Sequence, residues 1–326
     1  MIKVSVIIPI YKVEKFIERC VRSLMEQTLQ EVEYIFVDDS TPDNSIQILQ
    51  SVLKEYPNRA EQVKLLVHAH NKGLPAARNT GLSVASGEYI FHCDSDDYVD
   101  VDMLERLYEE AIRKEAEIVW CDWFLTFEKN ERYMKQPEYM SSIDALKAML
   151  SGGMKFNVWN KLVRRSLYID NQIVFPDGYG MGEDMTMMML FVHAKKVTYL
   201  PNAFYHYVKL NTGAFSQTYS DKHLVELQHN VKRIVEYIHH NFGNDLEKEL
   251  AFFKLEVKFP FLISGDSKKY ELWKKWYPES NAYILQNKNI STRSRWLQWF
   301  AWKEQFWIVK LYHGVLMKIV YGIIYR

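Results

Sequence analysis

The segment FHCDSDDYVD places a cluster of aspartates directly after a run of strand-forming residues, namely Asp94, Asp96, Asp97 and Asp100. Neighbouring carboxylates repel one another unless a cation lies between them. Magnesium and manganese take oxygen ligands and often bind through one or two carboxylates together with substrate phosphates. The pair Asp94-x-Asp96 therefore predicts a site for a divalent cation and a diphosphate. The alternative is an aspartate-rich turn that caps a helix beginning near Asp102.

A second acidic pair, Glu183 and Asp184, follows the glycine-rich segment 178–182 at the start of a predicted helix. A carboxylate in such a place can remove the proton of a hydroxyl while the hydroxyl oxygen attacks an electrophilic carbon. The pair therefore offers a general base. The alternative is that both acids only complement the helix dipole, which contributes about 0.3–1 kcal/mol.

Runs of β-branched residues alternate with amphipathic segments in the first part of the chain. The predicted strands cover residues 4–10, 32–39, 64–69, 88–94 and 117–124. The helical spacing of apolar residues predicts helices between them, including 15–27, 74–85 and 102–114. This alternation predicts an α/β fold with a mostly parallel, doubly wound sheet flanked by helices. Ligands bind such sheets at the carboxyl ends of the strands, where both Asp39 and the Asp94 cluster lie.

The chain beyond residue 124 is less regular. We predict helices over 142–150 and 183–196, and an aromatic, strand-like segment over 197–209 that Pro201 breaks. From Asp221 onward the apolar spacing is helical throughout. No internal repeat and no low-complexity linker marks a domain boundary.

The composition is that of an ordinary folded protein. The chain has 326 residues, 48% of them hydrophobic and 25% charged, and its formal net charge of zero gives no overall attraction to nucleic acid. The three cysteines, Cys20, Cys93 and Cys121, show no zinc-ligand spacing and fit a reducing compartment. The segment MIKVSVIIPI is expected to be a first strand and not a signal peptide, which predicts a cytoplasmic protein.

Taken in order, four motifs resemble the nucleotide-binding half of glycosyltransferase family 2. The matching segments are Val4–Tyr11, Val37–Ser40, Asn71–Gly81 and Gly87–Asp97. The resemblance extends, with fewer matches, to about residue 216. It implies a GT-A-type fold with a C-terminal helical extension, a divalent cation (Mn²⁺ or Mg²⁺), a nucleotide-sugar donor such as a UDP-sugar, and inversion at the anomeric carbon.

The same resemblance divides the chain into three parts. Residues 1–98 form the donor-binding half, 99–218 the half that binds the acceptor and carries the base, and 219–326 a helical region. It also assigns roles to single residues. Asp184 is the catalytic base, Asp96 binds the metal, and Asp94 binds the ribose. The remaining donor-binding residues are Pro9, Ile10, Tyr11, Glu14, Asp39, Asn71, Arg78 and Ser95.

Within this set, Asp39 is expected to accept a hydrogen bond from the uracil N–H, and Glu14 to touch the base. Pro9, Ile10 and Tyr11 would line the base and ribose pocket, although Tyr11 could equally serve packing. Arg78 would lie beside the base or the diphosphate, or else pair with a surface acid. Asp38 is expected only to orient the following loop.

Two later segments match the family less well. In 158–167, Trp159 and Lys161 could support the acceptor or the donor phosphate, or be a core tryptophan and a surface lysine. In 205–216 the family's arginine and serine positions hold Val208 and Ala214, so Lys209 is left to supply the charge of a loop over the diphosphate. His206 as a metal ligand is a minor alternative.

The C-terminal segment 293–326 is rich in tryptophan, phenylalanine and basic residues, with Glu304 as its single acid. Lys310, His313 and Lys318 interrupt its apolar stretch, which makes it a poor membrane span. The composition predicts helices that lie on the anionic cytoplasmic face of a membrane, with a docked helix or a homodimer contact as the alternative.

The predicted function is therefore sugar transfer to a glycan or lipid-linked acceptor in surface polysaccharide synthesis. The alternatives are a catalytically silent scaffold and a nucleotidyltransferase. The latter lacks support because the first strand–helix turn contains no glycine-rich phosphate loop.

Overall fold

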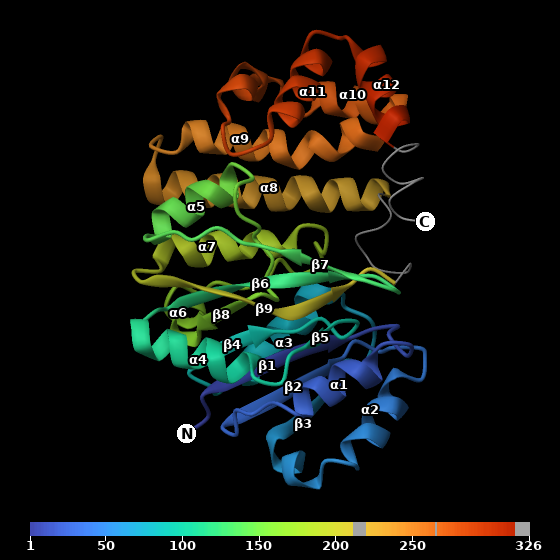
Figure 1. Cartoon of the computed structure of the whole chain (residues 1–326), viewed down its shortest axis with the longest axis vertical. Coiled ribbons are helices and arrows are strands. Elements are labelled where there is room, and N and C mark those ends of the chain that lie inside the picture. The colour runs from blue at the N-terminus through green and yellow to red at the C-terminus, as the bar shows by residue number, and fades with distance from the viewer. Residues whose placement is uncertain (211–219, 265, 317–326) are drawn as a thin grey trace. The chain divides into compact units, whose positions relative to one another are not determined.

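The computed structural model describes residues 1–210, 220–264 and 266–316 (Figure 1). The chain divides into two compact units. Unit 1 comprises Met1–Asp144 and Phe156–Tyr237, and unit 2 comprises Ala145–Lys155 and Ile238–Arg326. The predicted boundaries at residues 98 and 218 separate functions within the chain, and they stay predictions.

Unit 1 is built on one sheet with the strand order β3-β2-β1-β4-β8-β6-β9-β5, and β7 pairs with β6. Its first four strands are parallel to one another, as the alternation of strands and helices predicts: β1 Val4–Ile10, β2 Val32–Asp38, β3 Val63–Val67 and β4 Tyr89–His92. Every residue of β1 and β2 is buried, because the chain covers both faces of the sheet here.

The sheet becomes mixed beyond β4. Strand β8 is antiparallel to both β4 and β6, and β9 is parallel to β6. The bounds of the remaining strands are β5 Tyr98–Val99, β6 Ile118–Thr126, β7 Glu131–Met134, β8 Lys161–Arg164 and β9 Val197–Val208. The α/β, GT-A-type architecture is thus confirmed.

Strand β9 continues through Pro201, although its ladder with β6 is interrupted there. Cys121 of β6 pairs with Leu200, whereas the next residue, Asp122, pairs with Ala203. Pro201 therefore lies in a bulge, where its missing N–H breaks no ladder hydrogen bond. The predicted helix over 183–196 begins at the predicted residue as a 3₁₀ turn, η2 Glu183–Met185, continues as α7 Thr186–His193 and ends before residue 196.

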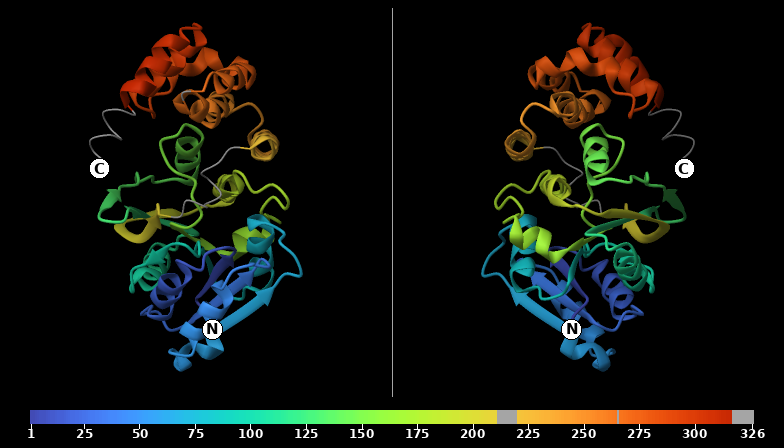
Figure 2. Two further views of the ribbon diagram at one scale, coloured as in Figure 1. Left: turned by 90° about the vertical axis from the view of Figure 1, so that its right-hand side faces the viewer. Right: turned by 90° about the vertical axis from the view of Figure 1, so that its left-hand side faces the viewer.

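Helices lie on both sides of the parallel part of the sheet (Figure 2). Helix α3 packs directly against β1, because a Cβ at Gly81 would lie 2.4 Å from Cγ2 of Ile7. Gly81 therefore permits a close helix–strand contact. The helices of unit 1, some of which extend into unit 2, are α1 Ile17–Met25, α2 Ser45–Leu53, η1 Pro57–Gln62, α3 Leu74–Val84, α4 Met103–Lys114, α5 Ser142–Leu150, α6 Arg165–Asp170 and α8 Asp221–Phe242.

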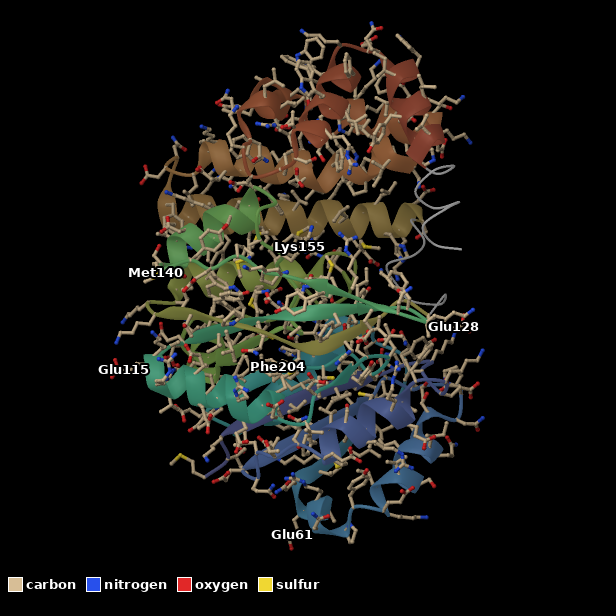
Figure 3. All side chains as sticks on the ribbon, in the orientation of Figure 1. Glu61, Glu115, Glu128, Met140, Lys155 and Phe204 are labelled. Carbon is tan, nitrogen blue, oxygen red and sulfur yellow. The ribbon has the colours of Figure 1, made fainter. Side chains whose placement is uncertain are left out.

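Side chains connect the sheet to its covering helices. Phe204 of β9, labelled in Figure 3, packs on the guanidinium of Arg106 in α4, whose carbon lies 5.7 Å from the ring centroid. The three cysteines are buried free thiols.

Unit 2 is helical, which confirms the predicted C-terminal helical region. Its further elements are α9 Glu247–Lys258, η4 Phe259–Ser264, α10 Ser267–Lys275, η5 Pro278–Gln286, α11 Thr292–Trp302 and α12 Phe306–Leu316. Among the described residues, none of the helices combines the length and the apolar character needed to cross a membrane.

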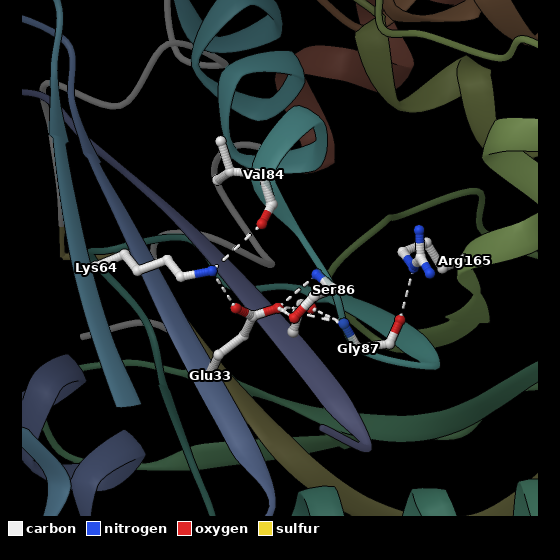
Figure 4. Close-up of polar contacts among 7 residues, drawn as sticks. Glu33, Lys64, Val84, Ser86, Gly87 and Arg165 are labelled. Carbon is white, nitrogen blue, oxygen red and sulfur yellow. Dashed lines mark hydrogen bonds and ion pairs between the residues drawn. The ribbon is translucent and has the colours of Figure 1, made fainter. Parts of the chain in front are cut away.

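Glu33 joins the starts of the parallel strands (Figure 4). Its carboxylate accepts hydrogen bonds from Ser5 Oγ of β1 and Lys64 Nζ of β3, each at 2.6 Å, and from the backbone N–H of Ser86 and Gly87 before β4 at 2.6 and 3.2 Å. Burial raises the pKa of Glu33, but the hydrogen bonds from Lys64, Ser5 and Ser86 outweigh it and hold the pKa at about 2.

We predict that Glu33→Gln destabilises the protein by roughly 1–3 kcal/mol at pH 7. A folded-state pKa below the unfolded value contributes stability that is present above about pH 4.3 and is lost as the pH falls toward 2. Urea denaturation at pH 7, 4 and 3 should therefore show the difference from the unmodified protein shrinking with acid. The exposed Glu61 provides the matched control Glu61→Gln, and an equal loss in both variants would contradict the prediction.

Candidate active site

The aspartates of the acidic loop between β4 and β5 differ in burial and in their contacts. Asp97 is buried, and its carboxylate accepts hydrogen bonds from Tyr205 Oη and Val208 N of β9, both at 2.7 Å. Tyr205 Oη in turn accepts a hydrogen bond from Asp94 N at 3.1 Å. Asp97 thus fixes the loop, which leaves the partly exposed Asp94 and Asp96 for chemistry.

The loop contains the turn that the alternative interpretation expected, since Asp97 N donates to Asp94 O at 3.1 Å. It does not cap the next helix with a side chain. Helix α4 has Asp102 at its N-cap, and the side chain of Asp102 accepts no capping hydrogen bond. Helix capping therefore does not explain the cluster.

Arg78 of α3 brings the two acidic clusters together. Its side chain is 1% exposed, and Nη2 lies 2.9 Å from Asp94 Oδ1. Nη1 lies 3.5 Å from Glu183 Oε1 and 3.7 Å from Asp184 Oδ1. The alternative of a surface ion pair for Arg78 is wrong, because the guanidinium is buried among acids from two distant segments.

Negative charge outweighs positive charge in this cluster. Burial raises the pKa of Asp94 to about 6; Arg78 acts in the opposite direction, and Asp96 and Asp184 add to the rise. Burial, followed by the charge of Asp184, also raises the pKa of Glu183 well above its ordinary value. Removal from water and mutual repulsion both disfavour ionised carboxylates, so an additional cation here would be stabilising.

A divalent cation fits the donor set. Asp94 and Asp96 present carboxylate oxygens from one loop, and hard divalent cations prefer such oxygens. In the described part of the chain, no group of three or more His, Cys, Asp or Glu side chains has the geometry of a metal cage. The fit is therefore to a cation that one or two carboxylates share with substrate phosphates.

Asp39 follows the end of β2 and is almost completely buried. Its Oδ1 accepts from Lys72 N at 2.8 Å and contacts His68 Nδ1 at 2.7 Å, while Oδ2 accepts from Gly73 N at 2.8 Å. These bonds fix the loop that leads into α3 and hence to Arg78. The neighbouring Asp38 accepts from Thr41 N at 2.8 Å, which confirms its predicted role of orienting the loop.

The residues at the end of β1 differ in exposure. Pro9 and Ile10 are buried, whereas Tyr11 is 40% exposed and so does not pack in the core. The carboxylate of Glu14 accepts from Asn44 N at 3.1 Å and so holds the start of α2.

Two other predicted donor-binding residues also differ in exposure: Asn71 is exposed on the loop before α3, and Ser95 is buried within the acidic loop. The donor-binding roles of all these residues stay predictions.

The segment that contains Glu183 and Asp184 lies beside a buried lysine. Lys161 of β8 is 1% exposed, and its Nζ donates to Asn157 O at 2.8 Å and Asn160 Oδ1 at 2.9 Å. Burial lowers its pKa to about 7, against the opposite effect of Asp184. A surface lysine is thus excluded. Trp159 is buried and stacks on Tyr205 with a centroid distance of 4.6 Å, as expected of a core tryptophan.

His206 of β9 makes its contacts with acids other than Asp94 and Asp96. Its ring nitrogens contact Glu131 Oε1 at 2.7 Å and Asp100 Oδ1 at 3.0 Å, and the ring stacks on Tyr98. These contacts account for the histidine without a metal. Ala214 lies outside the described residues, and the backbone N–H of Val208 donates a hydrogen bond to Asp97.

Sequence reasoning missed the two side chains that orient the acids, Tyr205 and His68. Each contacts an aspartate of a loop distant in sequence: Tyr205 begins the segment 205–216 but received no role there, and His68 belongs to none of the matched motifs. The aromatic run of β9 was the available signal for Tyr205, but it does not reveal which aromatic residue reaches the loop.

The α/β sheet with acids at its strand ends, together with the carboxylate pair Glu183 and Asp184 beside Arg78, is the arrangement of a glycosyltransferase of the GT-A type. Residues 5–182 match the family model described as glycosyl transferase family 2, and the chain belongs to that family. The match ends just before Glu183 and Asp184.

Relatives and solved structures agree with this assignment. The chain is 31% identical over 274 residues to the uncharacterized glycosyltransferase EpsJ of Bacillus subtilis, covering 80% of this chain and 77% of EpsJ. It is 30% identical over 216 residues to a poly(ribitol-phosphate) beta-glucosyltransferase of Bacillus spizizenii, covering 65% of this chain and 33% of that protein. The crystal structure of S. aureus TarS 1-349 in complex with UDP-GlcNAc has a TM-score of 0.70 at 19% identity, covering 96% of this chain and 91% of that one, which shows a common fold.

Proposed function

We propose that the protein is an inverting glycosyltransferase that moves a sugar from a UDP-sugar to a hydroxyl of a glycan or lipid-linked acceptor. The observation that carries this proposal is the Arg78 cluster, in which a strand-end aspartate and a carboxylate pair from a distant loop share one buried guanidinium. A donor diphosphate bound at Asp94 and Asp96 would thereby lie beside a base.

The donor site would use the carboxyl ends of β1, β2 and β4. Asp39 Oδ2 accepts one hydrogen bond, from Gly73 N, and a carboxylate oxygen has room for a second, which the uracil N–H would supply. Pro9, Ile10 and Tyr11 would line the base and ribose, and Asp94 would bind the ribose. The UDP-GlcNAc complex of TarS supports a uridine nucleotide for this fold.

Asp96, with Asp94 beside it, would hold a divalent cation against the diphosphate. Such a cation supplies positive charge that stabilises the leaving nucleotide diphosphate. The surplus of carboxylates around Arg78 supports this assignment, since Asp96 raises the pKa of Asp94 through its negative charge.

Asp184 would act as the base. Its side chain is 26% exposed, so an acceptor can reach it, and Arg78 contacts the same carboxylate. As the acceptor oxygen forms its bond to the anomeric carbon, its proton passes to Asp184 and the bond to the nucleotide diphosphate breaks on the opposite face. Attack opposite the leaving group inverts the anomeric configuration. The beta-glucosyltransferase among the relatives is consistent with this outcome.

We predict that Asp184→Asn lowers kcat by roughly 10²–10⁴-fold, because an amide cannot accept the hydroxyl proton. The affinity for UDP should stay close to that of the unmodified enzyme, since the nucleotide lies on β1, β2 and β4. Steady-state kinetics with a nucleotide release assay, together with calorimetric UDP binding, measures both quantities. Unchanged turnover would remove Asp184 as the base.

We predict that UDP with Mn²⁺ raises the Tm by several degrees more than other nucleoside diphosphates do, because a ligand of the folded state stabilises it. In Asp96→Asn the added effect of Mn²⁺ should disappear, while UDP alone still binds. Thermal-shift measurements with UDP, GDP, ADP and CDP, each with and without Mn²⁺, provide the comparison. Equal stabilisation by all four nucleotides would contradict a uridine donor.

The acceptor is proposed to be membrane-associated. On α11 and α12 of unit 2 the large apolar side chains Trp296, Trp307, Leu311 and Val315 are between 46% and 64% exposed. Lys310 lies on α12, and Lys303 is the C-cap residue of α11. Exposed aromatic and aliphatic side chains next to basic ones suit the headgroup region of an anionic membrane and would bring the enzyme to a lipid-linked surface glycan on the cytoplasmic side.

We predict that the double variant Trp307→Ser/Leu311→Ser floats less with vesicles containing anionic lipid, since it loses apolar area that the headgroup region would bury. The matched control is Val225→Ser, a similarly exposed apolar residue of α8. Equal flotation of the double variant and the control would show that this surface is not the membrane anchor. The remaining interpretation would be a homodimer contact, which sedimentation would reveal.

A further inference from the structure

We infer that one face of α8 holds the segment that carries the catalytic base, through Glu226, Asn230 and Arg233. This inference rests on the proposed role of Asp184. The three residues follow one another at spacings of four and three along the helix, so they lie on the same face. They are positioning residues, because they contact the backbone and the side chain of Thr186 in the base segment and not the reacting atoms.

Asn230 makes the central contact. It is 1% exposed, and its Nδ2 donates to both Tyr179 O and Met181 O at 2.9 Å. Both amide hydrogens of the side chain are thereby used on the glycine-rich turn that precedes Glu183 and Asp184. An aspartate at this position would be of similar size but would turn a carboxylate oxygen toward these two carbonyl oxygens.

Glu226 and Arg233 extend the contact in both directions. Glu226 is 4% exposed and accepts a hydrogen bond from Met181 N at 2.9 Å. Arg233 donates from Nη1 to Thr186 Oγ1 at 3.0 Å, and from Nη2 to Val174 O at 2.5 Å. The segment is therefore held both before and after Asp184.

The segment needs such partners because little regular structure holds it. Between Pro176 and Glu183 its backbone forms turns, and the carbonyl groups of Tyr179 and Met181 and the N–H of Met181 have their hydrogen-bond partners on α8. Gly182 has φ of +89°, and a Cβ there would lie 3.3 Å from Leu227 Cδ1, so the turn also packs closely on the same helix. The turn is thus shaped to fit α8.

The contacts of α8 on both sides of Asp184 in the sequence predict an effect on catalysis. In the sequence Asp184 lies between Met181 and Thr186, which both contact α8, and its Oδ1 lies 3.7 Å from Arg78 Nη1. Displacing a base by about 1 Å can cost on the order of 100-fold in rate. Loosening α8 from the turn should therefore lower kcat and leave nucleotide binding on β1, β2 and β4 largely intact.

The principal test uses Asn230→Asp in the full-length protein. We expect kcat to fall about 10- to 100-fold, with the affinity for UDP changed by less than about threefold. Glu226→Gln keeps an acceptor oxygen for Met181 N and should retain most of the activity, whereas Glu226→Ala should not. Val231→Ala, a truncation in the buried apolar core of the same helix, controls for a general loss of stability.

Hydrogen exchange of the Met181 amide provides a readout that does not depend on turnover. It should speed up in Asn230→Asp and Glu226→Ala, but not in Glu226→Gln or Val231→Ala. If the unmodified protein binds UDP but transfers no sugar, the proposed function fails, while the exchange pattern still tests the contact. Unchanged exchange and kcat in a folded Asn230→Asp variant would overturn the inference. The inference would also be overturned if Asn230→Asp lowered kcat and UDP affinity together, and if a Val231→Ala variant of equal Tm showed losses of the same extent.

Discussion

The guanidinium of Arg78 is the interaction on which the site depends. Removing an arginine side chain from water costs several kcal/mol, and a buried charge is tolerated where opposite charges and hydrogen bonds compensate it. Here the compensation comes from Asp94 on one side and Glu183 with Asp184 on the other. The guanidinium thus links the loop after β4 to a segment about ninety residues later and sets the distance between the two acidic clusters.

The scaffold fixes Arg78 and its partners through acids that hydrogen-bond to other parts of the chain. Asp39 ties the loop before α3 to β2, and Asp97 ties the acidic loop to β9 through Tyr205. In each cluster one aspartate orients the backbone so that another group can face the site. The apparent excess of carboxylates in the sequence therefore reflects two tasks, and only part of the cluster has to bind a ligand.

The remaining negative charge is the reason for proposing a cation and a diphosphate at this site. Asp94 has a pKa raised to about 6, mainly by burial, with Asp96 and Asp184 adding to the rise. A divalent cation shared with a diphosphate would relieve that repulsion while the donor is bound. In an enzyme of glycosyltransferase family 2, the proposed donor would thus supply the charge that balances these acids.

Local sequence patterns determined the elements and the positions of the acids. Runs rich in β-branched and aromatic residues form β1 and β2 because most positions of a sheet covered on both faces are apolar, and acids after such runs lie at the strand ends. Pro201 interrupts the ladder of β9, but the strand continues beyond it, because a bulge whose position depends on the pairing partner accommodates the proline. Only the tertiary structure decided which acids share Arg78, that Lys161 is buried, and that α8 contacts the segment around Glu183 and Asp184. These contacts join residues far apart in the chain, and no local periodicity or propensity encodes which distant side chain fills a given place in the fold.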